Sequence, residues 1–140
     1  MIRVLIPKDK EFTKYKQECK KLYKSVQSKI CDTNSFEFII NNTFFYMFLD
    51  NDTFTGVLYF FLDEENKMYV NGFGKRKYFL HHLECVKLAL SWFKCDIYAE
   101  AQNRASALCL LKCGFKRKNK NIFVKIKNCT SDHKKRLYGL

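Results

Sequence analysis

The segment from Asn103 to Phe115 constrains the fold more than any other stretch, because its sequence, NRASALCLLKCGF, specifies both ends of one helix. Asn103 is a good N-cap, since its side-chain oxygen accepts a hydrogen bond from a free backbone N–H group of the first turn. Gly114 stands where a left-handed residue commonly ends a helix, and Phe115 supplies the hydrophobic contact that follows. The residues between them are strongly apolar. The sequence therefore predicts a short helix with fixed ends.

Strands and helices are predicted around this helix from the spacing of apolar residues. Short apolar or alternating runs are typical of strands, and a spacing of three and four is typical of amphipathic helices. The predicted strands cover residues 2–6, 36–40, 43–49, 54–62, 68–71, 95–101 and 121–127. Two long helices are predicted at residues 10–29 and 78–93. This order predicts an α+β fold with a central mixed β-sheet flanked by helices.

The chain is expected to form one domain. Its 140 residues fit a domain of ordinary size. No linker, internal repeat or low-complexity block interrupts residues 1–127, which we assign to this domain. Residues 128–140 are polar and basic, and we interpret them as a C-terminal tail.

The chain is strongly basic, with 26 Lys and Arg against 14 Asp and Glu and a net charge of +12. Such a charge attracts nucleic acid, acidic protein surfaces or a phosphorylated cofactor, although a solvated basic surface is an equally good interpretation. No helix-turn-helix, RRM or zinc-finger pattern accompanies the lysine clusters. Any binding of nucleic acid is therefore predicted to be weak and non-specific. The clusters are Lys14–Lys24, Lys75–Lys77, Lys116–Lys120 and Lys134–Arg136.

The cysteines and the apolar runs indicate the setting in which the protein works. Seven cysteines are present, and none has the spacing of a zinc site, so no metal site is predicted. Most are interpreted as small core residues in a reducing cytosol. No apolar run reaches the ~18 residues that span a membrane. We expect an intracellular protein, or one packaged within an assembly, that has no membrane partner.

The predicted strand, the Asn103 helix ending in Gly-Phe, and the final strand resemble the C-terminal half of the fold of the GNAT superfamily of N-acetyltransferases. The order of elements matches that fold to about residue 127. The resemblance implies acetyl-CoA as cofactor and an amine of unknown identity as acceptor. It suggests an acetyl-CoA-dependent N-acetyltransferase.

In that superfamily the cofactor pyrophosphate lies at the N-terminus of the helix after the fourth strand, where free N–H groups and the helix dipole favour an anion. The equivalent stretch here is NGFGKRKY, residues 71–78. Its glycines come earlier than in the family, and three cations replace small residues. The stretch either still holds pyrophosphate or serves another partner. The cofactor-binding candidates are Gly72, Phe73, Gly74, Lys75, Arg76, Lys77 and Asn103.

The catalytic candidates also follow from the resemblance. The family often has a tyrosine four residues before the glycine of Gly-Phe, which protonates the departing thiolate. That position is Leu110 here, which has no proton to give. Tyr98 is the candidate substitute acid, although a packed tyrosine is the simpler interpretation. Glu100 is the candidate general base, with a partner for nearby cations as the alternative.

A narrower resemblance covers roughly residues 68–127. The basic loop Lys75–Tyr78 and Leu110 are similar to small GNAT-like proteins of short-tailed bacteriophages, one of which is an internal virion protein. This implies a phage-encoded protein in the bacterial cytoplasm or in the virion. It also leaves a second function open, a catalytically inactive virion component or a basic module that binds other virion proteins or nucleic acid.

Overall fold

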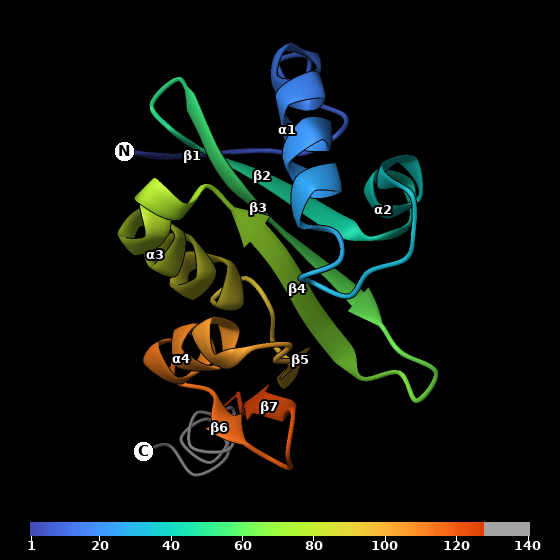
Figure 1. Cartoon of the computed structure of the whole chain (residues 1–140), viewed down its shortest axis with the longest axis vertical. Helices are drawn as coiled ribbons and strands as arrows, with labels where there is room; N and C mark the ends of the chain where they lie inside the picture. Colours follow the sequence, from blue (N-terminus) through green and yellow to red (C-terminus); the bar gives the residue numbers. More distant parts are fainter. Residues whose placement is uncertain (128–140) are drawn as a thin grey trace, which may run out of the picture.

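Seven strands form one mixed sheet within residues 1–127, the part of the chain that this computed structural model describes. The predicted tail lies outside the described residues. The strands are β1 (Ile2–Leu5), β2 (Phe44–Asp50), β3 (Thr53–Leu62), β4 (Met68–Gly74), β5 (Ile97–Glu100), β6 (Lys116–Arg117) and β7 (Ile122–Lys125). The helices are α1 (Phe12–Val26), α2 (Phe36–Asn42), α3 (Phe79–Leu90) and α4 (Arg104–Lys112), with a 3₁₀ turn (Arg76–Tyr78) before α3 (Figure 1).

The order of strands in the sheet is β1-β2-β3-β4-β5-β7-β6. All neighbours are antiparallel except β4 and β5, which are parallel. These two pair at Met68 with Ile97 and at Tyr69 with Tyr98. Beyond those residues β4 continues on β3 and β5 continues on β7, so the middle of the sheet opens. The predicted α+β architecture with a mixed sheet is confirmed.

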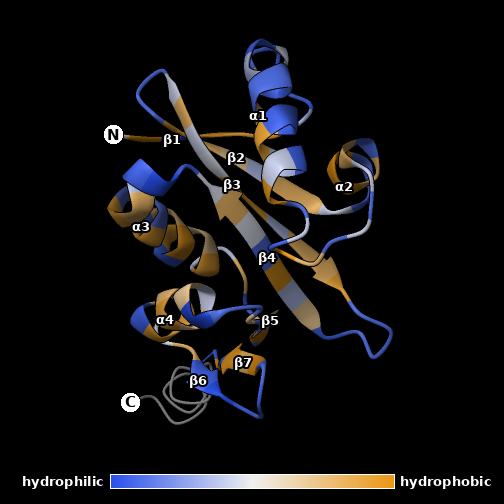
Figure 2. Ribbon diagram, in the orientation of Figure 1, coloured by the Kyte–Doolittle hydropathy of each residue, from blue (hydrophilic) through white to orange (hydrophobic). Residues whose placement is uncertain are grey.

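Two hydrophobic clusters cover the two faces of the sheet. Successive residues of a strand point to opposite faces. On β3, Val57 and Tyr59 join the cluster under α1 and α2, whereas Leu58 and Phe60 join the cluster under α3 and α4. The strands are largely hydrophobic in Figure 2, whereas α1 shows a long hydrophilic surface. Helices on both faces explain why β3 is buried along nearly its whole length.

Both predicted ends of α4 are confirmed. Asn103 Oδ1 accepts a hydrogen bond from Ser106 N at 2.9 Å, and Asn103 N donates to Ser106 Oγ at 3.2 Å, which forms a capping box. At the other end Gly114 has a φ of 90°. Gly114 N donates to Leu111 O and Phe115 N to Leu110 O, the two bonds of a Schellman motif. Phe115 is buried against the sheet.

Residues 36–40 differ from the prediction, because they begin helix α2 and not a strand. Ser35 Oγ accepts a hydrogen bond from Phe38 N at 3.1 Å and caps the helix. Phe36, Ile39 and Ile40 are buried together, which is the spacing of one helix face. An apolar run this short fits either structure until its packing partner is known.

Candidate functional site

A cleft of about 370 Å³ lies where β4 and β5 separate. We call it the β4–β5 cleft. Its walls come from the end of α1, the second half of β4, the 3₁₀ turn, the start of α3, the end of β5 and the first turns of α4. The lining residues are Val26, Lys29, Ile30, Asn71, Gly72, Phe73, Gly74, Lys75, Arg76, Phe79, His82, Glu100, Gln102, Asn103, Ala105, Ser106 and Cys109.

The backbone of β4 presents polar groups to this cleft. Lys75 N donates to Thr55 O at 2.9 Å, so this pair is hydrogen-bonded across β3 and β4. Hydrogen-bonded and non-hydrogen-bonded pairs alternate along an antiparallel ladder. Gly74 and Gly72, aligned with Gly56 and Leu58, are therefore non-hydrogen-bonded pairs, and their N–H and C=O groups face β5. Gly72 N already donates to Asn71 Oδ1 at 2.8 Å. This edge of β4 therefore offers an extended molecule the Gly74 N–H and the C=O groups of Gly72 and Gly74.

The two glycines of the NGFG stretch lie on β4 itself, before the turn into α3. A Cβ on Gly72 would lie 2.7 Å from Leu58 Cδ2 and 2.8 Å from Val57 O. Close packing against β3 thus requires glycine there. The side chain of Phe73 packs in the cluster under α1 and α2, with its ring centroid 5.5 Å from that of Tyr23. Gly72, Phe73 and Gly74 can therefore offer a ligand backbone groups but no polar side chain.

The three predicted cations of the turn have different surroundings. Lys75 Nζ forms an ion pair with Glu18 of α1 and lies 5.4 Å from the ring centroid of Phe54. Arg76 is exposed and lines the cleft. Lys77 is not among the lining residues, and its Nζ lies over the Tyr78 ring. Lys29, which follows α1, lines the cleft and was not predicted, because nothing local in the sequence distinguishes it from its lysine neighbours.

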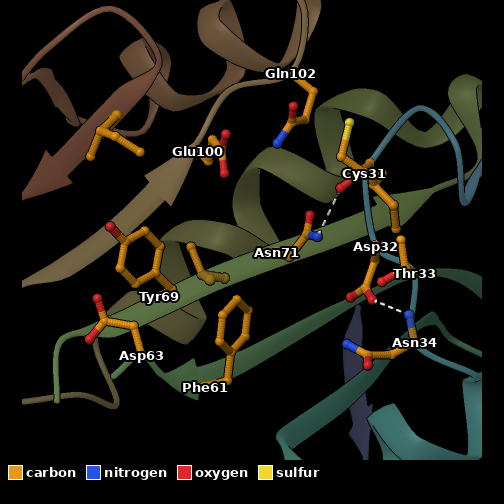
Figure 3. Close-up of a pocket in the computed structure, with 13 residues that line it drawn as sticks. Cys31, Asp32, Thr33, Asn34, Phe61, Asp63, Tyr69, Asn71, Glu100 and Gln102 are labelled. Atoms are coloured by element: carbon orange, nitrogen blue, oxygen red, sulfur yellow. Dashed lines mark hydrogen bonds between the residues drawn. The ribbon is translucent and has the colours of Figure 1, made fainter. Parts of the chain in front are cut away.

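A second hollow of about 370 Å³ adjoins the cleft and shares Ile30, Asn71, Glu100 and Gln102 with it. We call it the acidic pocket, because Asp32, Asp63 and Glu100 line it. Figure 3 shows Glu100 and Gln102 coming from the end of β5, with the loop that carries Cys31 to Asn34 on the other side. The pocket concentrates carboxylates in a protein whose net charge is +12.

The three carboxylates are held differently. Asp32 accepts hydrogen bonds from Tyr59 Oη at 2.7 Å and from Asn34 N at 2.8 Å. Asp63 accepts from the backbone of Glu65 and Lys67. Within residues 1–127, no ion pair or hydrogen bond engages the Glu100 carboxylate, which is exposed. Glu100 is therefore not the partner of a nearby cation there, and its carboxylate remains available to a ligand.

Tyr98 and Glu100, the two predicted catalytic residues, lie on the same face of β5, but only Glu100 lines the cleft. Glu100 lines both hollows. Tyr98 lines neither. The ammonium groups of Lys67 and Lys118 lie 5.4 and 5.1 Å from its ring centroid. The alternative interpretation of Tyr98 as a packed side chain describes this environment better than a role in proton transfer.

Leu110 packs against the core under α3 and α4, whereas its neighbour Cys109 lines the cleft. A hydrogen bond from the Cys113 thiol lowers the pKa of Cys109, and the charge of Lys112 acts in the same direction. Cys109 is thus the ionisable side chain that α4 places on the cleft. The position of a cysteine on a helix face follows from sequence, but its exposure to the cleft depends on how α4 packs.

His82 forms part of the cleft wall and was not predicted as a site residue. Its Nδ1 atom is buried and has no hydrogen-bond partner within the described residues. Burial lowers the pKa of His82 to about 4, and neighbouring His81 adds to this. The imidazole is therefore neutral at pH 7. Within residues 1–127 no group of three or more His, Cys, Asp or Glu side chains is placed to hold a metal ion.

None of the helices in residues 1–127 is long and apolar enough to cross a membrane. No family model matches the sequence. No curated protein matches it.

Solved structures of low sequence identity share the fold. The chain is similar to an acetyltransferase of the GNAT family from Staphylococcus aureus Mu50, with a TM-score of 0.61 and 12% identity over 91% of this chain and 100% of the other. It is also similar to an N-acetyltransferase from the same organism, with a TM-score of 0.66 and 14% identity over 90% and 97% of the chains. A ribosomal-protein-S5-alanine acetyltransferase from Vibrio fischeri has a TM-score of 0.65 at 12% identity, over 91% and 92%. The chain therefore has the fold of GNAT acetyltransferases.

Proposed function

We propose that this protein is an acetyl-CoA-dependent N-acetyltransferase that acts on a primary amine. The observation that carries the proposal is the opening between the parallel strands β4 and β5, with the polar edge of β4 on one side and Glu100 on the other. An extended molecule fits against a free strand edge, because main-chain hydrogen bonds then complete the ladder. The acidic pocket gives a second approach to the same carboxylate.

The residues of the cleft fit the cofactor in chemical terms. The pantetheine arm contains amides, which match the Gly74 N–H and the C=O groups of Gly72 and Gly74. Lys29 and Arg76 supply positive charge for its phosphates, next to the first turn leading into α3. When bound, acetyl-CoA supplies a thioester carbonyl that an amine can attack.

The amine must lose one proton before its lone pair forms the new C–N bond, and Glu100 is the group that takes it. The acidic pocket attracts the ammonium form and holds it beside this carboxylate. As the C–S bond breaks, the departing sulfur takes up one proton. Cys109 gives that proton and regains one from solvent, since Tyr98 lies outside the cleft lining. The nitrogen loses its second proton to solvent as the amide forms. The products are an amide and a free thiol, and one proton is released overall, because two protons leave the nitrogen and one joins the sulfur.

Thermal melting with acetyl-CoA and with desulfo-CoA tests the proposal. Binding to the native state alone raises the melting temperature once the ligand exceeds its dissociation constant. We expect a saturable upshift with both ligands, and release of free thiol with acetyl-CoA when an amine is supplied. Absence of any shift at millimolar ligand would contradict the proposal.

A second candidate function is a non-catalytic component of a virion, encoded by a short-tailed phage. Leu110 favours this function because it cannot donate a proton. Lys75 also favours it, because its ammonium group forms an ion pair with Glu18 and not with a cofactor phosphate. The lysine-rich face of α1 would then bind acidic virion proteins, or nucleic acid weakly and with strong dependence on salt. Its prediction is recovery of the protein from purified virions, together with no effect of acetyl-CoA on melting.

A further inference from the structure

A third hollow of about 280 Å³ lies beside the other two, between the start of α4 and the β6–β7 hairpin. We call it the basic pocket, because Arg104, Arg117 and Lys120 line it. Gln102 lines all three hollows, and Asn103 lines both the β4–β5 cleft and the basic pocket. The acidic and basic pockets therefore meet at one residue, which also borders the proposed site of reaction.

The basic pocket has a fixed guanidinium group. Arg117 Nη1 donates a hydrogen bond to Lys120 O at 2.6 Å. The guanidinium carbon lies 4.9 Å from the ring centroid of Phe123, which is fully buried. This leaves further N–H groups of Arg117 for a ligand, in a plane set by the protein. A cation held in this way loses less conformational entropy on binding than a free surface lysine.

The positive charge of the pocket is not neutralised by the described part of the chain. The ion pairs within residues 1–127 include none of its three cations. The acidic pocket, in contrast, carries three carboxylates, and one of them is Glu100. Pockets of opposite charge therefore adjoin Gln102. A ligand that matches both sides carries a positive group and a negative group.

We propose that the acceptor is a primary amine that bears a carboxylate or phosphate close to it. The ammonium group occupies the acidic pocket beside Glu100, and the anionic group occupies the basic pocket. This proposal rests on the proposed function, and it names the acceptor class for that site. Glu100 lies two residues before Gln102, the residue that both pockets share, so the carboxylate and the basic pocket adjoin one short segment. The N-terminus of a peptide whose second or third residue is acidic carries both charges close together and is the probe of this class.

Acetylation of matched peptides tests the acceptor class. One peptide has Glu at positions 2 and 3, and the other has Gln there. We expect the wild-type protein to use the Glu peptide with roughly tenfold higher kcat/KM at low salt, chiefly through KM, because the charge contacts are formed on binding. β-Alanine and β-alaninamide form a second pair, which differs only in the carboxylate near the amine. If only this small-molecule pair shows a preference for the carboxylate, the acceptor is a small amine, and the assignment to a peptide N-terminus is overturned.

The variant R104Q/R117Q/K120Q removes the basic pocket. We expect it to use both peptides equally, while its melting shift with acetyl-CoA stays at the wild-type value. The matched control K20Q/K21Q/K24Q removes three cations from α1 and is expected to keep the preference. Equal use of both peptides by the wild-type protein, or loss of the preference in the control, would overturn the proposal. The double variant R104Q/K120Q leaves Arg117 on Phe123 and is expected to keep part of the preference if the triple variant unfolds.

Binding without turnover separates this proposal from the proposed function. Fluorescence anisotropy of the Glu peptide, labelled at its C-terminus, is measured with coenzyme A present. We expect tighter binding of the Glu peptide than of the Gln peptide, and loss of the difference in the triple variant. If acetyl-CoA causes no melting shift, the enzymatic proposal fails even where this difference is found. If acetyl-CoA shifts the melting temperature and the two peptides bind equally well, the proposed acceptor class is wrong, whereas the proposal of an acetyltransferase stands.

Discussion

His82 on α3 occupies the space that a side chain at Gly56 on β3 would need. A Cβ on Gly56 would lie 3.0 Å from His82 Nδ1 and 2.9 Å from Phe73 O. A Cβ on Gly74, the neighbour of Gly56 across the ladder, would also lie close to His82 Nδ1, at 3.2 Å. Because neither glycine has a side chain, the imidazole of His82 packs directly against their backbone. This lets α3 approach the sheet beside the β4–β5 cleft.

Substitution of Gly56 by alanine is expected to destabilise the protein by about 1–3 kcal/mol, because overpacking a close contact forces neighbouring atoms to move. The backbone carbonyl of Phe73 cannot move away as a flexible side chain would. Urea unfolding measures the effect. Gly74→Ala is the matched comparison and is expected to cost less, because its contacts are longer. An unchanged free energy of unfolding for Gly56→Ala would contradict the packing described here.

Burial of neutral His82 makes stability depend on pH. The pKa is about 6.5 for an unfolded histidine and about 4 in the folded protein. The unfolded state therefore binds the proton first, so stability from this group is complete above pH 6.5 and falls as pH decreases toward 4. The loss is at most about 3 kcal/mol at 1.36 kcal/mol per pH unit.

The measurement is the free energy of unfolding at several pH values between 7 and 4 for the wild-type protein and His82→Gln. Carboxylates contribute to both proteins equally, so the difference between the two slopes reports His82. A shallower decline in His82→Gln is expected. Parallel curves would show that the folded protein accepts a proton at His82 without penalty.

Glu100→Gln tests the general base. The change keeps the shape of the side chain and removes its ability to take a proton, so kcat is expected to fall by about 10²–10⁴. The melting shift with acetyl-CoA should persist, because the cations and the β4 edge are unaltered. Glu64→Gln, in the turn before β4, is the control and should leave the rate unchanged. A rate for Glu100→Gln within a factor of two of the wild type would exclude the proposed role.

Cys109→Ala is expected to lower kcat by about 10–100-fold, because a positioned acid contributes by proton transfer. Cys113→Ala tests the link between the two thiols. The hydrogen bond from Cys113 lowers the pKa of Cys109, so its removal raises that pKa. An acid works only while protonated, and the alkaline limb of the pH–rate profile should therefore move to higher pH.

Exposed Cys95 lies outside the cleft lining and supplies the control for the thiol variants. Cys95→Ala should keep both the rate and the pH profile. An alkaline limb that stays in place in Cys113→Ala, or that moves to lower pH, would show that Cys109 is not the proton donor.

The helix prediction at residues 10–29 identified α1 and its lysine-rich face, although the helix is shorter than expected and starts at Phe12. Asp9 is of a residue type that commonly caps a helix. Its side chain accepts a hydrogen bond from Ile6 N, which closes the turn before the helix. The periodicity of a long helix survives such local changes, whereas its end depends on which of several polar side chains is engaged.

The site was harder to predict than the fold. Glu100 was proposed from the family resemblance, and it lines the β4–β5 cleft. Tyr98, two residues earlier, was proposed with it, but its side chain does not line the cleft and lies near the ammonium groups of Lys67 and Lys118. Lys29 and Arg117 come from distant segments, and no local pattern marks them as neighbours of the cleft.

The sequence by itself determined the two ends of α4, because the Asn103 cap and the Gly114 turn depend on hydrogen bonds between residues at most five apart. It also determined the mixed sheet through the order of its strands. Only the tertiary structure decided that residues 36–42 form a helix and that β4 and β5 separate after two pairs. Those outcomes depend on packing and register between segments far apart in the chain, where each local sequence is compatible with more than one arrangement.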